Sequence, residues 1–271
     1  MPELPEVETT ARGLRRVLIG KRVQAVRGID WPRMLPNASP EELQATLPGL
    51  AVTGVDRRGK FLLVCFEDGR TLAIHRKMSG NLLLRTVDSP SEPHTHFELV
   101  FDELTTLRLV DPRKFGRVYL FHSAMDRDTF FEERLGPEPL TDLDLAERLR
   151  HRRGRIKSLL LDQAFLAGVG NLYADEVLWE AGIHPLRTAD SLVDDELECL
   201  TVAIKQVLVL AIERRGTSFS DYLDADGSRG ENQEFLRVYG RGSEPCSRCG
   251  TPISRIVIGQ RSSYFCPTCQ R

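Results

Sequence analysis

Four cysteines near the end of the chain have the spacing of a metal site. They form two Cys-x-x-Cys pairs, Cys246 with Cys249 and Cys266 with Cys269, with sixteen residues between the pairs. Each pair lets a tight turn direct two thiolates at one tetrahedral zinc ion, and four thiolates leave no open position for a substrate. The alternative is a pair of disulfides, which we disfavour because we see no export signal. The spacing therefore predicts one structural Zn²⁺ in a zinc ribbon that needs the metal to fold.

The N-terminal stretch MPELPEVE combines two prolines with three glutamates. Proline fits the first turn of a helix, where its missing N–H costs nothing, and acidic side chains there face the positive end of the helix dipole. Apolar residues then recur at three- and four-residue steps as far as Leu18, and Gly20 follows as a stop signal. The pattern predicts an amphipathic helix over residues 2–19.

Two basic blocks stand out although the formal net charge is only −2. Residues 148–157 contain six Arg or Lys and no acid, and residues 237–271 contain six Arg and the single acid Glu244. Blocks of this kind are either electrostatic footprints for phosphates or solvated faces. The charge runs alone leave both interpretations open.

Length and composition are typical of a soluble globular protein with two domains. The chain has 271 residues, of which 41% are hydrophobic and 28% charged. The longest apolar run, residues 207–212, is too short to cross a bilayer. The N-terminus is acidic and amphipathic, whereas a secretory leader would be basic and then apolar. We therefore expect a cytoplasmic protein with no membrane partner.

The first half of the chain reads as a series of short strands separated by turn signals such as Glu-Asp-Gly at 67–69. The alternation favours an antiparallel sandwich or barrel over βαβ units. Cys65 and Cys199 lie in apolar stretches and are predicted to be buried packing residues. The predicted strands are 22–28, 51–55, 60–66, 71–75, 81–85, 97–101, 106–110 and 117–121.

The segment LGPEPL at 135–140 breaks this pattern, and mostly helical sequence follows. The predicted helices are 142–151, 155–163, 170–181, 193–214 and a short one at 218–224, with a polar loop over 224–234. The predicted domains are an N-terminal β domain over 1–135, a linker over 136–150, a helical domain over 151–235 and the zinc ribbon over 236–271.

In their order and spacing, the motifs resemble those of bacterial formamidopyrimidine-DNA glycosylases, which excise oxidised purines such as 8-oxoguanine. The resemblance covers nearly the whole chain and implies an α+β fold: an antiparallel β-sandwich with flanking helices, then a helix–two-turn–helix domain with a zinc finger. Before Met78 the family usually has an apolar residue and a glycine, where this chain has Arg76 and Lys77. The matching motifs are PELPEVET at 2–9, RGKFLL at 58–63, MSG at 78–80, DPRKFG at 111–116, LGPEP at 135–139, GVGNLYA at 168–174, AGIHP at 181–185, VYGR at 238–241 and the four-cysteine finger.

The resemblance implies two activities, a glycosylase and an abasic-site lyase, with Pro2 as the nucleophile once Met1 is removed. An α-amino group titrates well below lysine, so part of it is unprotonated at neutral pH. Attack of this secondary amine on C1′ gives a cationic iminium, and elimination of the 3′ and then the 5′ phosphate can follow. Glu3 matches the acid that protonates the deoxyribose ring oxygen, Glu6 matches a supporting acid, and Lys60 matches a phosphate contact that assists elimination.

The resemblance also implies that damaged double-stranded DNA is the partner of a monomeric protein, in the bacterial nucleoid. Met78, Arg113 and Phe115 match the wedge that fills the gap left by a flipped nucleotide, with Arg113 facing the orphaned cytosine. Residues 218–234 match the segment that closes over the extruded base. The positions that match phosphate contacts are Lys157, Asn171 and Arg261.

Two alternatives stay open. Endonuclease VIII-type glycosylases share the architecture but prefer oxidised pyrimidines, and Leu4, Arg113 and Phe115 favour the purine enzymes over them. A non-catalytic zinc-ribbon DNA-binding protein would be expected to lack the nucleophile or the acid, whereas Pro2 and Glu3 are both present.

Overall fold

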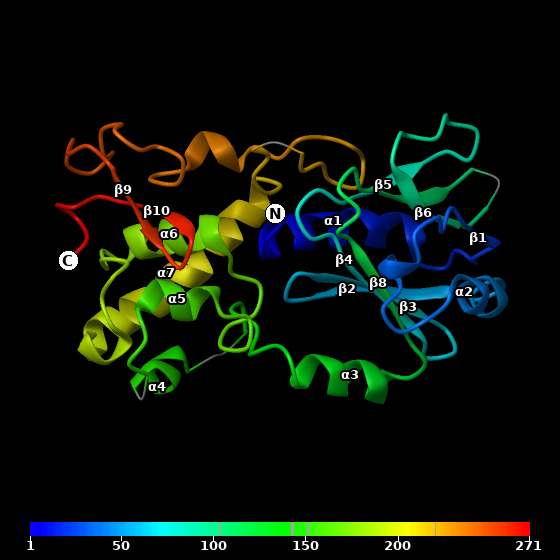
Figure 1. Ribbon diagram of the computed structural model, residues 1–271, viewed down its shortest axis with the longest axis horizontal. Helices are drawn as coiled ribbons and strands as arrows, with labels where there is room; N and C mark the ends of the chain where they lie inside the picture. Colours follow the sequence, from blue (N-terminus) through cyan, green and yellow to red (C-terminus); the bar gives the residue numbers. More distant parts are fainter. Residues whose placement is uncertain (103, 142–143, 151, 220) are drawn as a thin grey trace. The chain divides into compact units, whose positions relative to one another are not determined.

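The computed structural model describes residues 1–102, 104–141, 144–150, 152–219 and 221–271. The chain divides into two compact units, and Figure 1 labels most of their helices and strands. Unit 1 comprises Met1–Glu133 together with Arg214–Gln233, and unit 2 comprises Arg134–Glu213 together with Glu234–Arg271. The segment that follows the long helix of unit 2 in sequence therefore belongs to unit 1.

Unit 1 is built on two four-stranded antiparallel sheets, with strand orders β2-β3-β4-β8 and β1-β6-β7-β5. One hydrophobic core contains side chains from both sheets and from the N-terminal helix, as the alternating sequence pattern predicts. The antiparallel β architecture is confirmed. The strands are β1 (Ala25–Arg27), β2 (Val52–Arg58), β3 (Phe61–Phe66), β4 (Thr71–His75), β5 (Asn81–Arg85), β6 (Thr95–Val100), β7 (Thr106–Val110) and β8 (Arg117–Phe121).

Helix α1 (Leu4–Leu18) packs against β2 and β3. Its apolar stripe, which includes Val7 and Leu14, is buried in the core. The helix begins two residues later than predicted, because Glu3 is its N-cap and Pro5 lies in the first turn. Pro2 therefore precedes the helix instead of forming part of its first turn.

Unit 1 also contains two helices that the sequence analysis missed, α2 (Pro40–Thr46) and α3 (Ala124–Glu132), and the 3-10 turn η1 (Pro32–Met34). Both α-helices begin at a serine whose hydroxyl accepts a first-turn N–H at 3.1 Å: Ser39 from Glu42, and Ser123 from Asp126. A serine followed three residues later by an acid is an N-terminal capping signature. That local signal was present in the sequence.

Unit 2 combines helices with an antiparallel hairpin. Helix α6 packs against α5, α7 and strand β10. None of the described helices is long and apolar enough to cross a membrane. The elements are α4 (Leu145–Arg150), α5 (Ile156–Leu161), α6 (Asn171–Glu180), η2 (Ala189–Ser191), α7 (Asp194–Glu213), β9 (Ser254–Ile258) and β10 (Arg261–Phe265); η3 (Asn232–Phe235) begins in unit 1 and ends in unit 2.

Helix α4 occupies part of the predicted helix 142–151, of which residues 142, 143 and 151 lie outside the described residues. The short helix predicted over 218–224 is wrong: the described residues there, 218–219 and 221–224, are not helical. Ser218 donates its hydroxyl to the carbonyl of Tyr222 at 2.8 Å, so a side-chain contact closes this loop in place of a helical turn.

The cysteines outside the finger also differ from expectation. Cys65 is half-buried on β3, and Cys199 is exposed on α7, so the burial predicted for Cys199 is wrong. Helix α7 buries Leu197, Leu200 and Ala203. Cys199 is two residues from Leu197 and therefore lies on a different face of the helix.

Candidate functional site

The predicted nucleophile and acids lie together at the start of α1. Pro2 is buried, and Glu3 and Glu6 are only 5% and 3% exposed, whereas Met1 is 52% exposed. The Glu6 carboxylate accepts the backbone N–H of Glu3 at 2.7 Å. Because Glu3 is the N-cap, this bond fixes the backbone of the residue that follows Pro2.

Residues 214–233, which we call the return segment, contact the same turn of α1. The second oxygen of the Glu6 carboxylate accepts the N–H of Thr217 at 2.8 Å, and the Tyr222 hydroxyl donates to the Glu6 carbonyl at 3.3 Å. Gly216 has φ +78°, and a Cβ there would lie 3.0 Å from the Glu6 side chain. Glu6 thus joins the start of α1 to the return segment, a contact between residues 211 positions apart that no sequence pattern signals.

Lys60 lies in the two-residue turn between β2 and β3, where Gly59 has φ +55°. The lysine side chain is 6% exposed. Arg57 ties this turn to α1, because its Nη1 donates to the Gly59 carbonyl at 3.0 Å and its Nε lies 3.3 Å from the Glu8 carboxylate. The structure therefore places an enclosed lysine in a turn that is anchored to the N-terminal helix.

The three predicted wedge residues are Met78, Arg113 and Phe115. They lie on two turns that one buried carboxylate joins: Asp111 accepts the hydroxyl of Ser79 and, at 2.7 Å, the N–H of Gly116. Met78 and Phe115 are 48% and 43% exposed, and the Arg113 guanidinium lies 4.9 Å from the centre of the Phe115 ring. The structure thus brings two exposed apolar side chains and a cation onto linked turns of unit 1. Sequence reasoning missed Asp111 as the residue that links them.

In unit 2 the predicted phosphate-binding residues meet at the hairpin β9–β10. The carbonyl of Ser262 accepts Lys157 Nζ at 3.2 Å and Asn171 Nδ2 at 2.9 Å. Arg261 precedes Ser262, is exposed, and follows a turn whose two residues both have positive φ. Lys157 and Asn171 therefore hold the backbone of the hairpin from which Arg261 projects.

Two consecutive acids on α6, which sequence reasoning missed, complete this arrangement. Asp175 Oδ1 lies 2.6 Å from Lys157 Nζ with both side chains 0% exposed. Burial raises the pKa of the Asp175 carboxyl, and the Lys157 ammonium opposes that rise. Glu176 accepts the backbone N–H groups of residues 237–239 at 2.8–2.9 Å. The signal was an acid pair inside the otherwise apolar stretch LYADEVLW, since buried carboxylates need partners.

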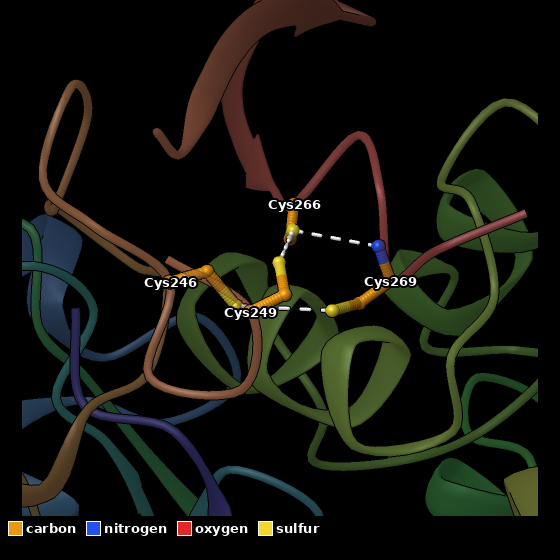
Figure 2. A group of neighbouring side chains, drawn as sticks. All are labelled: Cys246, Cys249, Cys266 and Cys269. Carbon is orange, nitrogen blue, oxygen red and sulfur yellow. Dashed lines mark hydrogen bonds between the residues drawn. The ribbon is translucent and has the colours of Figure 1, made fainter. Parts of the chain in front are cut away.

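The four predicted zinc ligands converge on one point, as Figure 2 shows. All four Sγ atoms lie within 4.8 Å of one another, with Cys246 and Cys269 at 4.0 Å and Cys249 and Cys266 at 3.5 Å. Tetrahedral zinc with Zn–S bonds of about 2.3 Å separates its sulfurs by about 3.8 Å. A disulfide would instead bring two sulfurs to about 2.05 Å. The donor set and its geometry fit one structural Zn²⁺.

The finger packs on helix α6. Trp179 shares a hydrophobic cluster with Val238, Ile253 and two of the cysteines. Arg248, between the first pair of cysteines, donates to the Trp179 carbonyl at 2.7 Å, and its guanidinium lies 3.8 Å from the centre of the Trp179 ring. The metal site is therefore continuous with the helical part of unit 2.

Three family models match the chain in order. Residues 1–118 match the formamidopyrimidine-DNA glycosylase N-terminal domain, residues 135–222 match the formamidopyrimidine-DNA glycosylase H2TH domain, and residues 243–271 match the zinc finger found in FPG and IleRS. The fold and the site together define a DNA repair glycosylase that binds DNA and carries a zinc finger.

The chain belongs to the formamidopyrimidine-DNA glycosylase family. It is 48% identical to the formamidopyrimidine-DNA glycosylase of Herpetosiphon aurantiacus over 276 aligned residues, which cover all of both chains. It is also similar, over the whole of both chains, to a mutant of Lactococcus lactis FPG in complex with DNA that contains Fapy-dG, at 37% identity and a TM-score of 0.92. MutM in complex with DNA that contains carbocyclic 8-oxo-G matches over both full lengths at 37% identity and a TM-score of 0.91. The predicted family, α+β fold and zinc finger are confirmed.

Proposed function

We propose that this chain is a bifunctional DNA glycosylase and abasic-site lyase that excises oxidised purines from duplex DNA. The observation that carries the proposal is the placement of Pro2 and Glu3, both buried at the start of α1, behind an exposed Met1. An exposed Met1 is accessible to an aminopeptidase. Fapy-dG and 8-oxo-G in the DNA of two related complexes support a purine substrate, and an oxidised pyrimidine in the DNA of another Lactococcus lactis FPG complex is the reason to compare both classes of lesion.

The first step is displacement of the base by the N-terminal amine. Removal of Met1 turns the Pro2 nitrogen into a secondary amine, and an α-amino pKa of about 8 leaves an appreciable unprotonated fraction at neutral pH. Its lone pair attacks C1′, and the bond from C1′ to the base nitrogen breaks so that the base leaves with that electron pair. The amine then loses its proton, Glu3 protonates O4′ as the sugar ring opens, and the nitrogen becomes a cationic iminium.

The iminium drives the two eliminations. It withdraws electrons from C2′, so a C2′ proton can be removed, a C2′=C3′ double bond forms and the 3′ phosphate leaves. A second elimination expels the 5′ phosphate, and water then hydrolyses the iminium and restores the amine. Lys60 supplies a cation for the phosphate, and Glu6 holds the backbone of Glu3 and so the position of the nucleophile.

Extrusion of the damaged nucleotide is assigned to the exposed turns of unit 1. Unstacking a base costs a few kcal/mol, and apolar side chains inserted into the gap recover part of that cost. Met78 and Phe115 are the apolar side chains available, and Arg113 supplies hydrogen-bond donors for the base left without a partner. Arg261 supplies a phosphate contact from the finger.

Borohydride trapping on abasic-site DNA tests the nucleophile. The matched pair is the same protein with an uncleaved N-terminal tag and with the tag removed to leave Pro2 first, so that only the amine differs. We expect a covalent adduct only from the protein that begins at Pro2, and peptide mapping should place it on that residue. An adduct from the tagged protein, or on an internal lysine, would refute the proposed mechanism.

A side-by-side excision assay tests the substrate class. We expect faster release of 8-oxoguanine opposite cytosine than of thymine glycol. Preference for thymine glycol would identify the endonuclease VIII type instead. DNA binding with neither excision nor trapping would identify a non-catalytic DNA-binding protein.

A further inference from the structure

Arg76 is a buried cation that directly follows strand β4, two residues before Met78. Its side chain is 2% exposed, and its Nη1 donates to the Thr10 hydroxyl on α1 at 3.1 Å. The guanidinium carbon lies 5.2 Å from the centre of the Tyr222 ring in the return segment. Among the described residues, its Nε and Nη2 have no hydrogen-bond partner.

The stability of the core does not explain an arginine here. Burial lowers the pKa of the Arg76 guanidinium, which measures the cost of removing its charge from water. Electrostatic interaction with Tyr222 and with the charge of Glu6 offsets part of that cost. An apolar side chain of similar volume would fill the same space without the cost of removing a charge from water. The presence of a charged side chain at residue 76 is therefore explained by the groups that it contacts.

Arg76 contacts three parts of the proposed site at once. Its carbonyl accepts the N–H of Gly80 at 3.1 Å, so its backbone forms the turn that presents Met78. Its side chain reaches Tyr222, whose hydroxyl donates to the carbonyl of Glu6. One residue thus connects the Met78 turn, the return segment and α1, which it reaches directly at Thr10 and through Tyr222 at Glu6.

We propose that Arg76 is a positioning residue that holds the return segment against the first turn of α1 and so keeps Glu6 in place behind Glu3. The inference rests on the proposed function, because it is the excision reaction that uses these acids. The cation acts on the return segment through Tyr222 and on α1 through Thr10. It does not touch the substrate.

Amide hydrogen exchange of the full-length, DNA-free protein tests the contact directly. The variant is Arg76→Met, which keeps the bulk and removes the charge, and the control is Arg16→Met on the exposed face of α1. We expect the amides of the return segment, above all Thr217, to exchange about tenfold faster in Arg76→Met, with sheet amides unchanged. Arg76→Lys should restore part of the protection. Unchanged exchange, or acceleration spread over the whole of unit 1, would overturn the inference.

Kinetics separate a positioning role from simple packing. We expect Arg76→Met to lower the excision rate at saturating DNA about tenfold or more while KM stays within about twofold, because the acids are displaced and the DNA-binding surface is not. An unchanged rate at saturation would also overturn the inference.

Tyr222→Leu removes the other half of the contact and should give the same local exchange, which keeps the test available if Arg76→Met does not fold. A wild-type protein without excision activity would refute the proposed function, whereas the exchange result would still decide the role of Arg76.

Discussion

Lowering the pH from 7.5 to 5.0 is expected to weaken unit 1 through one residue, His75, by about 2 kcal/mol. His75 ends β4 just before the Met78 turn, and its Nδ1 accepts the N–H of Lys77 at 3.0 Å, where Lys77 has φ +55°. Its ring packs edge-on against Phe61 with centroids 4.7 Å apart. Burial, and then the charges of Lys77, Lys60 and Arg76, lower the pKa of His75 to about 3.

The magnitude follows from linkage between protonation and folding. The unfolded histidine has a pKa of 6.5, and the folded one of about 3 stays neutral at pH 5. The contribution of His75 to the free energy of unfolding is therefore fully present above pH 6.5. It falls by about 1.4 kcal/mol per pH unit below that value, which gives about 2 kcal/mol over the roughly 1.5 units down to pH 5.0.

His75→Asn is the matched variant, because Asn Oδ1 can accept the Lys77 N–H in place of Nδ1 and does not titrate. Denaturant unfolding at both pH values should show that the wild type loses about 2 kcal/mol more than the variant. An NMR titration should place the His75 pKa far below the ordinary value of 6.5. Parallel pH dependences for the two proteins, or a ring that titrates near its ordinary value, would refute the reasoning.

Three further predictions concern unit 2. Chelation of zinc, or Cys249→Ser, should unfold residues 236–271 and weaken DNA binding, while unit 1 keeps its β-sheet circular dichroism. An unchanged affinity for DNA would refute a role of the finger in DNA binding. Lys157→Met should cost about 3–5 kcal/mol in urea unfolding because it leaves Asp175 buried without its cation, and adding Asp175→Leu should recover most of that loss. A double variant as unstable as the single one would show that the charge of Asp175 is not the cause. Arg261→Ala should reduce the slope of log affinity against log salt by about 1 without changing the thermal midpoint, and an equal slope would exclude a phosphate contact.

Local patterns predicted most of the elements. Alternating apolar residues identified the strands of both sheets, and the spacing of apolar residues identified α1 and α7. The missed helices α2 and α3 span only 7 and 9 residues, and in each case the serine cap was the main signal. The helix expected over 218–224 does not form because the Ser218 hydroxyl accepts the N–H of Gly230 and the Tyr222 hydroxyl donates to the carbonyl of Glu6, and a local propensity does not include these partners.

The sequence by itself determined the zinc finger, because two Cys-x-x-Cys turns fix the ligand geometry within a few residues of chain. It also determined that a helix begins within the first few residues, because Pro5 and Glu6 favour the first turn of α1, although its exact start lies two residues later than predicted. Only the tertiary structure decided that the N–H of Thr217 bonds to the Glu6 carboxylate and that the Arg76 guanidinium packs against the Tyr222 ring. The same is true of the ion pair between Asp175 and Lys157. Each of these contacts pairs buried polar groups from distant segments, and which partner satisfies a buried group depends on the packing of the whole unit and not on neighbouring residues.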